Sequence, residues 1–255
     1  MDITLQLDRS LEYAERNFLD NSARHLQVDK AFLSKHFDLN GKLVLDFGCG
    51  MGGMSLWYAS NWHCKVHGVD IDGHHVQVAE VLRDRHGLRN VEFEKRDILE
   101  TPLTDTYDCA MLNDVAEHIP YPVLEGILRQ IGERLRPGGR IFVSYPPWQG
   151  PYASHVTRVT GLPWSQYIPD FILIPWLRRR PFQLTGEHES NLIEAYRGLN
   201  HLTHTSLMRV AEKAGLRLAV RHSHSIAARF LPQSLVRLFP FNFLISKEIV
   251  LLEKA

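Results

Sequence analysis

The amino-acid sequence predicts an α/β fold with a mainly parallel sheet and helices on both of its faces. Short apolar runs alternate with amphipathic helical patterns between residues 42 and 145. A glycine-rich turn follows the first apolar run, and acidic residues follow the first three runs. Alternating strands and helices require right-handed crossovers, which make the strands parallel and place helices over both faces of the sheet.

The N-terminal region is predicted to be helical. Residues 8–37 carry apolar side chains at mixed three- and four-residue spacings, which indicate one or two amphipathic helices, and we assign residues 1–41 to this segment. From Lys42 onward the pattern is that of the sheet. Strands are expected at 43–45, 65–69, 91–93, 107–112 and 141–144, and helices at 54–60, 74–86 and 123–135, the last ended by Pro137-Gly138.

The alternation stops after the fifth strand. Residues 145–200 are rich in Pro, Trp, Tyr and Arg, and we interpret residues 146–200 as a lid insertion. Regular elements then return, with a helix at 203–214, a strand at 216–220, an irregular stretch at 223–246 and a strand at 248–252. Residues 42–145 and 201–255 are therefore assigned to one α/β domain.

Composition excludes several classes of function. Lys plus Arg and Asp plus Glu number 29 each, so no global basic field concentrates nucleic acid, and we expect no nucleic-acid partner. The three cysteines form no C-x-x-C pair, which argues against a zinc ribbon or a disulfide scaffold, and no metal site is expected. The N-terminus is charged throughout, and no apolar run approaches the ~20 residues that span a bilayer. We expect a cytoplasmic protein; nothing in the sequence predicts its oligomeric state.

The glycine-rich turn at 44–53 follows a strand and precedes a helix, where glycines let a ligand approach the backbone. Gly48, Gly50 and Gly53 also satisfy the dinucleotide pattern G-x-G-x-x-G. An NAD site would place a pyrophosphate at the helix N-terminus, where the carboxylate of Asp46 would repel it. S-adenosylmethionine carries an ammonium and a sulfonium and no phosphate, so Asp46 favours this ligand, and an NAD-binding protein is the weaker alternative.

Two further carboxylates follow the next two strands. Asp70 ends the second strand, about 20 residues past the glycines, where an acidic side chain accepts both ribose hydroxyls of an adenosine ligand. Asp97 follows the third strand, where its carboxylate can accept the adenine amino group while the next backbone N–H, that of Ile98, serves the ring. Three acids at three consecutive strand ends favour S-adenosylmethionine.

With these residues the sequence resembles the class I S-adenosylmethionine-dependent methyltransferases. Asp46-x-Gly48-x-Gly50-x-Gly52 is similar to the family's first motif, 68–72 to its second and 96–98 to its adenine-side motif, while 107–118 and 135–139 resemble the segments around the fourth strand and before the fifth. The resemblance covers residues 42–145 in order and 202–253 more weakly. It implies a seven-stranded Rossmann-like sheet with an antiparallel last strand and S-adenosylmethionine as cofactor. The implied donor-binding residues are Asp46, Gly48, Gly50, Gly52, Asp70, Ile71, Asp97, Ile98 and Asn113.

The resemblance implies methyl transfer, and a hydroxyl acceptor also needs a base. Among 14 histidines we take His155 as the catalytic candidate, because it lies just beyond the fifth strand, in the segment that should overhang the methyl group. Glu117-His118 is interpreted as a structural or helix-start pair, and Cys49 as a small filler in the turn. The rival histidines, each with a surface or packing role as the alternative, are His201, His204, His222 and His224.

The methyl acceptor is expected to be a small molecule, a glycan or a lipid-like compound, modified at O or N. The insertion is rich in aromatic residues and carries Arg178-Arg179-Arg180 after an apolar run, and a second apolar-basic stretch lies at 227–245. Packing of the lid's own core is the simpler explanation. The sharper one is a pocket for an amphipathic or anionic acceptor, or a peripheral contact with a membrane surface. Residues 145–176 also loosely resemble inserts in bacterial methyltransferases near polysaccharide and natural-product pathways.

The end of the fourth strand bears on the alternatives. It reads Asn113-Asp114-Val115-Ala116, without the Asn/Asp-Pro-Pro-aromatic signature of amino-methylating nucleic-acid enzymes, and Pro146-Pro147-Trp148 comes one strand too late. A noncatalytic S-adenosylmethionine-binding regulatory protein is the alternative of a different class, because donor binding does not prove transfer.

Overall fold

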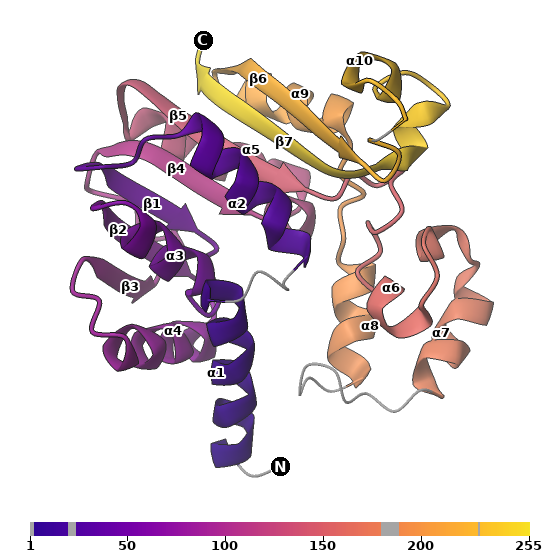
Figure 1. Ribbon diagram of the computed structural model, residues 1–255, viewed down its shortest axis with the longest axis horizontal. Helices are drawn as coiled ribbons and strands as arrows, with labels where there is room; N and C mark the ends of the chain where they lie inside the picture. The colour runs from indigo at the N-terminus through magenta and orange to yellow at the C-terminus, as the bar shows by residue number, and fades with distance from the viewer. Residues whose placement is uncertain (1–2, 20–23, 180–188, 229) are drawn as a thin grey trace.

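Figure 1 shows a computed structural model of the chain, in which residues 3–19, 24–179, 189–228 and 230–255 are described. The sheet has seven strands in the order β3-β2-β1-β4-β5-β7-β6. Strands β1 to β5 pair in parallel, and β7 runs antiparallel to both of its neighbours. This confirms the predicted fold. The strands are β1 (Leu43–Phe47), β2 (Lys65–Asp70), β3 (Val91–Lys95), β4 (Tyr107–Asn113), β5 (Leu135–Tyr145), β6 (Leu216–Ser225) and β7 (Ile245–Lys254).

Helices cover both faces of this sheet. The helices on one face are α1 (Ile3–Leu19), α2 (Arg24–His36), α3 (Gly53–Asn61) and α4 (Gly73–Arg85), and those on the other are α5 (Tyr121–Glu133) and α9 (His204–Lys213). The side chains of β5 alternate between the two cores, with Phe142 in the first and Ile141 and Val143 in the second. Because successive strand residues point to opposite faces, a strand covered on both sides is apolar at successive positions.

The N-terminal segment forms two helices, as predicted. The first, α1, packs against α3 and α4. A Cβ on Gly53 would lie 2.7 Å from the Cβ of Asn17 and 2.9 Å from the carbonyl oxygen of Ala14, so this glycine lets α1 approach the start of α3. The second, α2, lies against the other half of the sheet, where the rings of Phe32 and Phe142 have centroids 6.1 Å apart.

The boundary between α5 and β5 differs from the prediction. The helix ends at Glu133 and β5 begins at Leu135, whereas the sequence predicted a helix through residue 135 ended by Pro137-Gly138. Tyr107 pairs with Leu135 and Cys109 with Arg140, so residues 136–139 bulge opposite a single residue of β4. Pro137-Gly138 therefore lies in a strand bulge, where Gly138 adopts a φ of 77°.

The insertion after β5 has an apolar core of its own. Figure 1 shows its helices on the right, beside the sheet. They are α6 (Thr157–Thr160), η2 (Ser165–Tyr167), α7 (Asp170–Arg178) and α8 (Glu189–Arg197). The core that they share consists of Val156, Leu173, Ile174, Leu177, Ile193, Tyr196 and Leu199. We call this part of the chain the insertion lobe; Arg180 and Phe182, which also belong to the predicted lid, lie outside the described residues.

The segment between β6 and β7 contains two short helices, α10 (Gln233–Val236) and η3 (Phe241–Leu244). It adjoins the insertion lobe, because the indole N–H of Trp164 donates to the carbonyl oxygen of Phe243 over 3.1 Å. None of the helices within the described ranges is both long and apolar enough to cross a membrane.

Candidate functional site

The glycine turn between β1 and α3 has one glycine that faces open space. Gly48, Gly50 and Gly52 all adopt a positive φ, of 67°, 52° and 79°. A Cβ on Gly48 would lie 2.6 Å from Val115, and one on Gly52 would lie 2.7 Å from both Ala79 and Phe93. A Cβ on Gly50 would meet no atom within 4 Å. Gly48 and Gly52 therefore permit close packing, whereas Gly50 leaves the turn open to a ligand.

Asp70, at the end of β2, is bound to this turn. Its carboxylate accepts the backbone N–H of Gly50 over 2.8 Å and that of Asp72 over 2.9 Å, and Nδ1 of His75 lies 3.7 Å away. Burial alone would raise the pKa of Asp70, but the hydrogen bonds from His75, Asp72 and Gly50 lower it below its ordinary value. The side chain is thus held ionised beside the open glycine.

Asp46 lies beneath the turn rather than on its surface. It is 2% exposed, and its Oδ2 accepts the hydroxyl of Ser55 over 2.5 Å. Burial raises the pKa of Asp46 to about 7, the hydrogen bond from Ser55 opposes this, and the charge of Asp70 adds to it. The carboxyl group of Asp46 therefore lies next to the glycine turn, as expected, and its hydrogen bond with Ser55 holds the start of α3.

A cavity of about 370 Å³ lies beside β3, and two of the expected donor-binding residues line it. They are Ile71, whose side chain is 70% exposed, and Asp97, whose Oδ1 accepts the backbone N–H of Leu99 over 2.9 Å. The next residue, Ile98, has its side chain in the core with 1% exposed. A ligand here could reach Ile98 only through its backbone, the group to which the sequence analysis assigned the adenine ring.

Asn113 ends β4, the neighbour of β1 in the sheet. Its Oδ1 accepts the hydroxyl of Tyr58 over 2.7 Å, which fixes the orientation of the amide. Its Nδ2 is buried and has no hydrogen-bond partner among the described residues. The chain then passes directly beside the glycine turn, because Val115 is the residue that a Cβ on Gly48 would strike.

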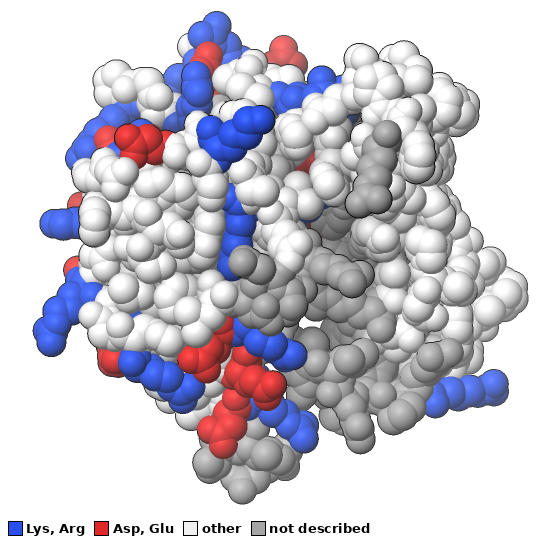
Figure 2. Space-filling view, in the orientation of Figure 1, with Lys and Arg blue, Asp and Glu red and all other residues white. Residues whose placement is uncertain are grey.

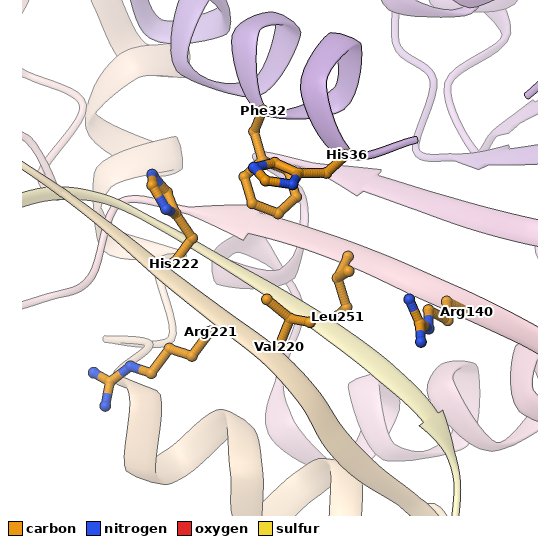
Figure 3. A pocket seen from close by; sticks show the side chains of 7 residues that line it. All are labelled: Phe32, His36, Arg140, Val220, Arg221, His222 and Leu251. Carbon is orange, nitrogen blue, oxygen red and sulfur yellow. The ribbon is translucent and has the colours of Figure 1, made fainter. Parts of the chain in front are cut away.

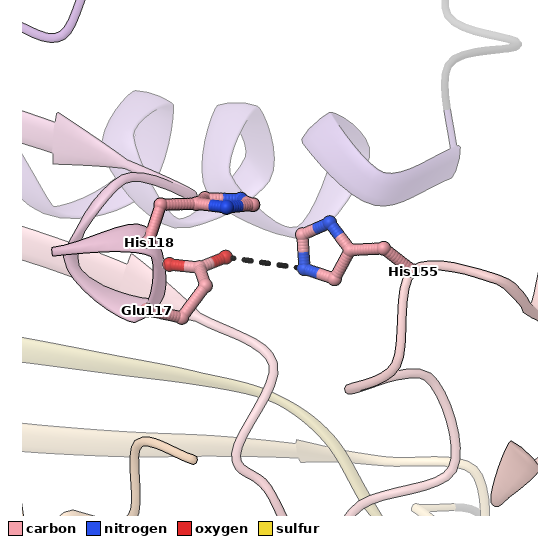
Figure 4. A group of neighbouring side chains, drawn as sticks. All are labelled: Glu117, His118 and His155. Carbon is pink, nitrogen blue, oxygen red and sulfur yellow. Dashed lines mark ion pairs between the residues drawn. The ribbon is translucent and has the colours of Figure 1, made fainter. Parts of the chain in front are cut away.

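Three polar side chains meet where this passage ends. Glu117 and His118 lie in the short helix η1 (Ala116–His118), and His155 reaches them from the segment after β5. Figure 4 shows the His155 ring pointing at the Glu117 carboxylate, with Nε2 of His155 3.5 Å from Oε1. The two imidazole rings meet edge to face with centroids 4.8 Å apart. Burial lowers the pKa of His118, and the charge of His155 adds to this.

The sequence was compared with models of known protein families. Residues 44–139, which run from β1 to the bulge of β5, match a family described as a methyltransferase domain. Residues 44–139 thus match a methyltransferase domain, in a sheet with the Rossmann-like fold of class I S-adenosylmethionine-dependent methyltransferases. Its fold is similar to that of the magnesium protoporphyrin IX methyltransferase of Synechocystis with bound S-adenosylhomocysteine, with a TM-score of 0.57 and 18% identity over 91% of this chain and 84% of that one.

Two curated relatives are similar in sequence to the chain. A tRNA U34 carboxymethyltransferase of Desulfotalea psychrophila is 28% identical over 59% of this chain and 48% of its own length. A ubiquinone biosynthesis O-methyltransferase of Nitrosococcus oceani is 27% identical over 65% of this chain and 75% of its own length. The match thus spans about half the length of the first relative. The names of the two relatives point to different acceptors.

The four rival histidines have other surroundings. His201 stacks on Trp148 with centroids 3.8 Å apart, and Nδ1 of His204 lies 2.8 Å from buried Glu248. His222 is hydrogen-bonded to the side chain of Gln233 over 3.0 Å, and burial lowers the pKa of His224. Of the five candidate histidines, His155 is the one that contacts Glu117 and His118.

Sequence reasoning missed a buried ion network at the same edge of the sheet. Nζ of Lys247 lies 2.5 Å and 2.6 Å from the two carboxylate oxygens of Asp114 and 3.1 Å from Asp29. Burial raises the pKa of Asp29 to about 6, although the charge of Lys247 opposes this. The network joins α2, β7 and the end of β4, and Ser144 of β5 donates to Asp29 over 2.8 Å.

A second cavity, of about 240 Å³, lies on the face of the sheet between α2 and the strands β6 and β7. Figure 3 shows its lining, and none of the expected donor-binding residues takes part. Its charged or titratable side chains are two arginines and two histidines, with no carboxylate for a cationic ligand. The residues expected to bind the donor therefore lie at the strand ends and not at this cavity. The lining residues are Phe32, His36, Arg140, Val220, Arg221, His222 and Leu251.

Proposed function

We propose that the chain is a methyltransferase that binds S-adenosylmethionine at the glycine turn and transfers its methyl group to O or N of a small-molecule, glycan or lipid-like acceptor. The observation that carries the proposal is the open face of Gly50, bordered by ionised Asp70 on one side and followed by the Glu117, His118 and His155 cluster on the other. A donor laid across the turn would have its adenosine near β2 and β3 and its methyl group near the cluster.

The donor contacts follow from the groups that are free to make them. Asp70 uses two of its carboxylate lone pairs for backbone N–H groups, which leaves others for the ribose hydroxyls. Exposed Ile71 would cover the adenine ring, and Asp97 would accept its amino group. The buried Nδ2 of Asn113 would donate to the methionine carboxylate, since an unpaired buried amide is costly.

The reaction is an in-line displacement. A lone pair of the acceptor forms a bond to the methyl carbon, the bond from that carbon to sulfur breaks, and sulfur keeps the electron pair as S-adenosylhomocysteine leaves. Positioning and the exclusion of water supply part of the acceleration. The acceptor also loses a proton, and we propose that the imidazole of His155 accepts it as the general base.

The acceptor side favours a compound with an apolar part. Figure 2 shows charged side chains gathered over the sheet on the left and few of them over the insertion lobe and the segment before β7 on the right. Several large apolar side chains are exposed there: Tyr167 53%, Phe171 78%, Phe230 84%, Leu238 59% and Phe239 79%. Such a surface suits a lipid-like acceptor or a contact with a membrane surface. One relative is named as an enzyme that acts on tRNA. The expectation that this chain has no nucleic-acid partner therefore stays a prediction.

Calorimetry tests the donor site directly. S-adenosylhomocysteine should bind, and NAD should not. Asp70→Ala should weaken the binding by roughly 1.5 to 3 kcal/mol, the value typical of a hydrogen bond to a charged group, while Asp97→Ala should cost less because its carboxylate is already exposed. Binding of NAD without S-adenosylhomocysteine would overturn the proposal.

Transfer itself is tested with labelled S-adenosylmethionine in a cell extract. Label should move to an extracted small molecule, glycan or lipid, and His155→Ala should lower the rate by roughly 10²- to 10⁴-fold with little change in donor affinity. Donor binding without any labelled product would favour the noncatalytic regulatory protein instead.

A further inference from the structure

The cluster of Glu117, His118 and His155 has the composition of a metal site. Each residue offers one ligand atom, and these atoms all lie within 4.8 Å of one another. Figure 4 shows all three side chains turned toward the same point. Two imidazoles and one carboxylate form a ligand set that catalytic zinc sites use, with a fourth position left for water or substrate.

The carboxylate of Glu117 is the unexplained group in this cluster. Its side chain is 3% exposed, and neither oxygen has a hydrogen-bond partner among the described residues. Nε2 of His155 lies 3.5 Å from Oε1 but makes no hydrogen bond to it. Because a buried charge without partners is strongly destabilising, the site as it stands lacks a positive charge.

Neighbouring groups do not supply that charge. The ammonium of Lys247 is already held by Asp114 and Asp29. The amide of Asn200 donates to the carbonyl oxygens of Ala116 and Ile119, over 2.7 Å and 2.6 Å. Asp29, Asp114 and Glu117 all lie near the ammonium of Lys247, but the short contacts of this ammonium are with Asp29 and Asp114, which leaves the charge of Glu117 for a bound cation to neutralise.

The backbone places His155 here at a cost. Its φ is 58°, in the left-handed region that residues with a Cβ rarely adopt. Such conformations persist where the surroundings fix them and are concentrated at functional sites. The conformation turns the imidazole of His155 from the start of the insertion lobe toward the end of β4.

We propose that Glu117, His118 and His155 bind a divalent transition-metal ion, for which Zn²⁺ fits the nitrogen and oxygen ligands best. Ligand shifts of about 1 Å would bring all three atoms to the ~2.0–2.2 Å bond lengths of zinc. The open position would face the proposed methyl end of the donor. There the ion would bind the acceptor oxygen or nitrogen and stabilise its deprotonated form, so that the proton could leave to solvent and His155 would act as a metal ligand instead of as the base; in this respect the inference rests on the proposed function and deepens it.

Metal binding is measured without activity. The full chain, freed of metal by a chelator, is titrated with Zn²⁺, and with Co²⁺ as a probe whose visible absorption reports its ligand geometry. One ion should bind per cluster. Glu117→Gln and His155→Ala should each weaken the affinity by at least the 10- to 100-fold that follows loss of an outer-shell partner.

His204→Ala is the matched control. His204 also faces a buried carboxylate, with Nδ1 2.8 Å from Glu248, but Arg221 already neutralises that group over 2.6 Å. This variant should bind Zn²⁺ as the parent chain does. Should Glu117→Gln not fold, His155→Ala carries the test, because the His155 side chain is 29% exposed. Equal Zn²⁺ affinities for the parent chain and both cluster variants would overturn the metal site.

The two proposals fail separately. Unchanged methyl transfer by metal-free protein would overturn the metal's role in the reaction and leave the methyltransferase proposal intact. If the metal-loaded parent chain does not bind S-adenosylhomocysteine, the result counts against the methyltransferase proposal. The titrations with Zn²⁺ and Co²⁺ would still decide whether the metal site exists.

Discussion

Asp46 is almost wholly buried beneath the glycine turn, and its protonation depends on pH near neutrality. Burial raises its pKa from 3.8 to about 7 in the folded chain. Between these values the folded state holds a proton that the unfolded state has lost, so stability falls as pH rises from about 4 to about 7. Asp46→Asn should remove this fall and exceed the parent chain in stability at pH 8 by roughly 1–3 kcal/mol, since each pKa unit corresponds to about 1.4 kcal/mol.

Urea unfolding of both chains between pH 4 and pH 8 measures this difference. Ser55→Ala is the informative companion, because it removes the hydroxyl that stabilises the ionised Asp46. Its stability should go on falling to a higher pH than that of the parent chain, because loss of this hydrogen bond raises the pKa of Asp46 further. Parallel pH profiles for the parent chain and Asp46→Asn would show that Asp46 does not titrate in this range.

Single residues also show how far sequence reasoning reaches. Asp70 could be placed at the turn because parallel strands end at one edge of the sheet, where ligands bind, and the structure does bond it to Gly50. Glu117 could not be assigned in the same way. Its burial and its contact with His155 depend on how the insertion lobe packs, which the sequence pattern does not report. The one signal in the sequence that could have pointed to Glu117 is its position, since it is an acidic residue shortly after the end of β4, at the edge of the sheet where ligands bind.

Two glycines in the turn between β1 and α3 allow the cost of backbone strain to be measured apart from the cost of overpacking. Gly50 and Gly52 both have a positive φ, so alanine costs strain at either position. The Cβ of Gly52→Ala would also strike Ala79 and Phe93 at 2.7 Å, whereas that of Gly50→Ala enters open space. Gly52→Ala should therefore be less stable than Gly50→Ala by roughly 1–3 kcal/mol, the usual cost of overpacking.

Thermal unfolding and S-adenosylhomocysteine calorimetry on the two variants check this. Gly50→Ala should stay folded and lose donor affinity, because its methyl group occupies the open face of the turn. Equal melting temperatures would contradict the packing role of Gly52, and unchanged donor affinity in Gly50→Ala would move the donor away from this glycine.

The elements themselves were largely predictable, with one instructive exception. Periodicity located all seven strands and the helices between them, because buried strands and amphipathic helices have distinct apolar spacings. It misplaced Pro137-Gly138, which was interpreted as the end of a helix and lies in the bulge of β5. Proline and glycine mark a turn and a bulge alike, and the difference depends on pairing with β4, which is a long-range contact.

For the molecule as a whole, the question is how the insertion lobe is coupled to the sheet. The lobe has its own core, yet both of its ends are bonded to the domain. The backbone N–H of Trp148 donates to the carbonyl oxygen of Leu202 over 2.7 Å, and that of Asn200 donates to the carbonyl oxygen of Glu117 over 2.9 Å. The second bond joins the lobe to the segment that passes the glycine turn.

This connection predicts that the donor site and the lobe respond together. Hydrogen exchange with and without S-adenosylhomocysteine should show protection at the glycine turn and also at residues 113–118, 150–160 and 198–202, because ordering of the turn restrains Val115 and, through Asn200, the base of the lobe. Asn200→Ala removes the side-chain bonds to Ala116 and Ile119 and should reduce protection in the lobe while leaving that of the turn. Protection confined to residues 43–113 in the parent chain would show that the donor does not close the lobe, and any closure would then depend on the acceptor.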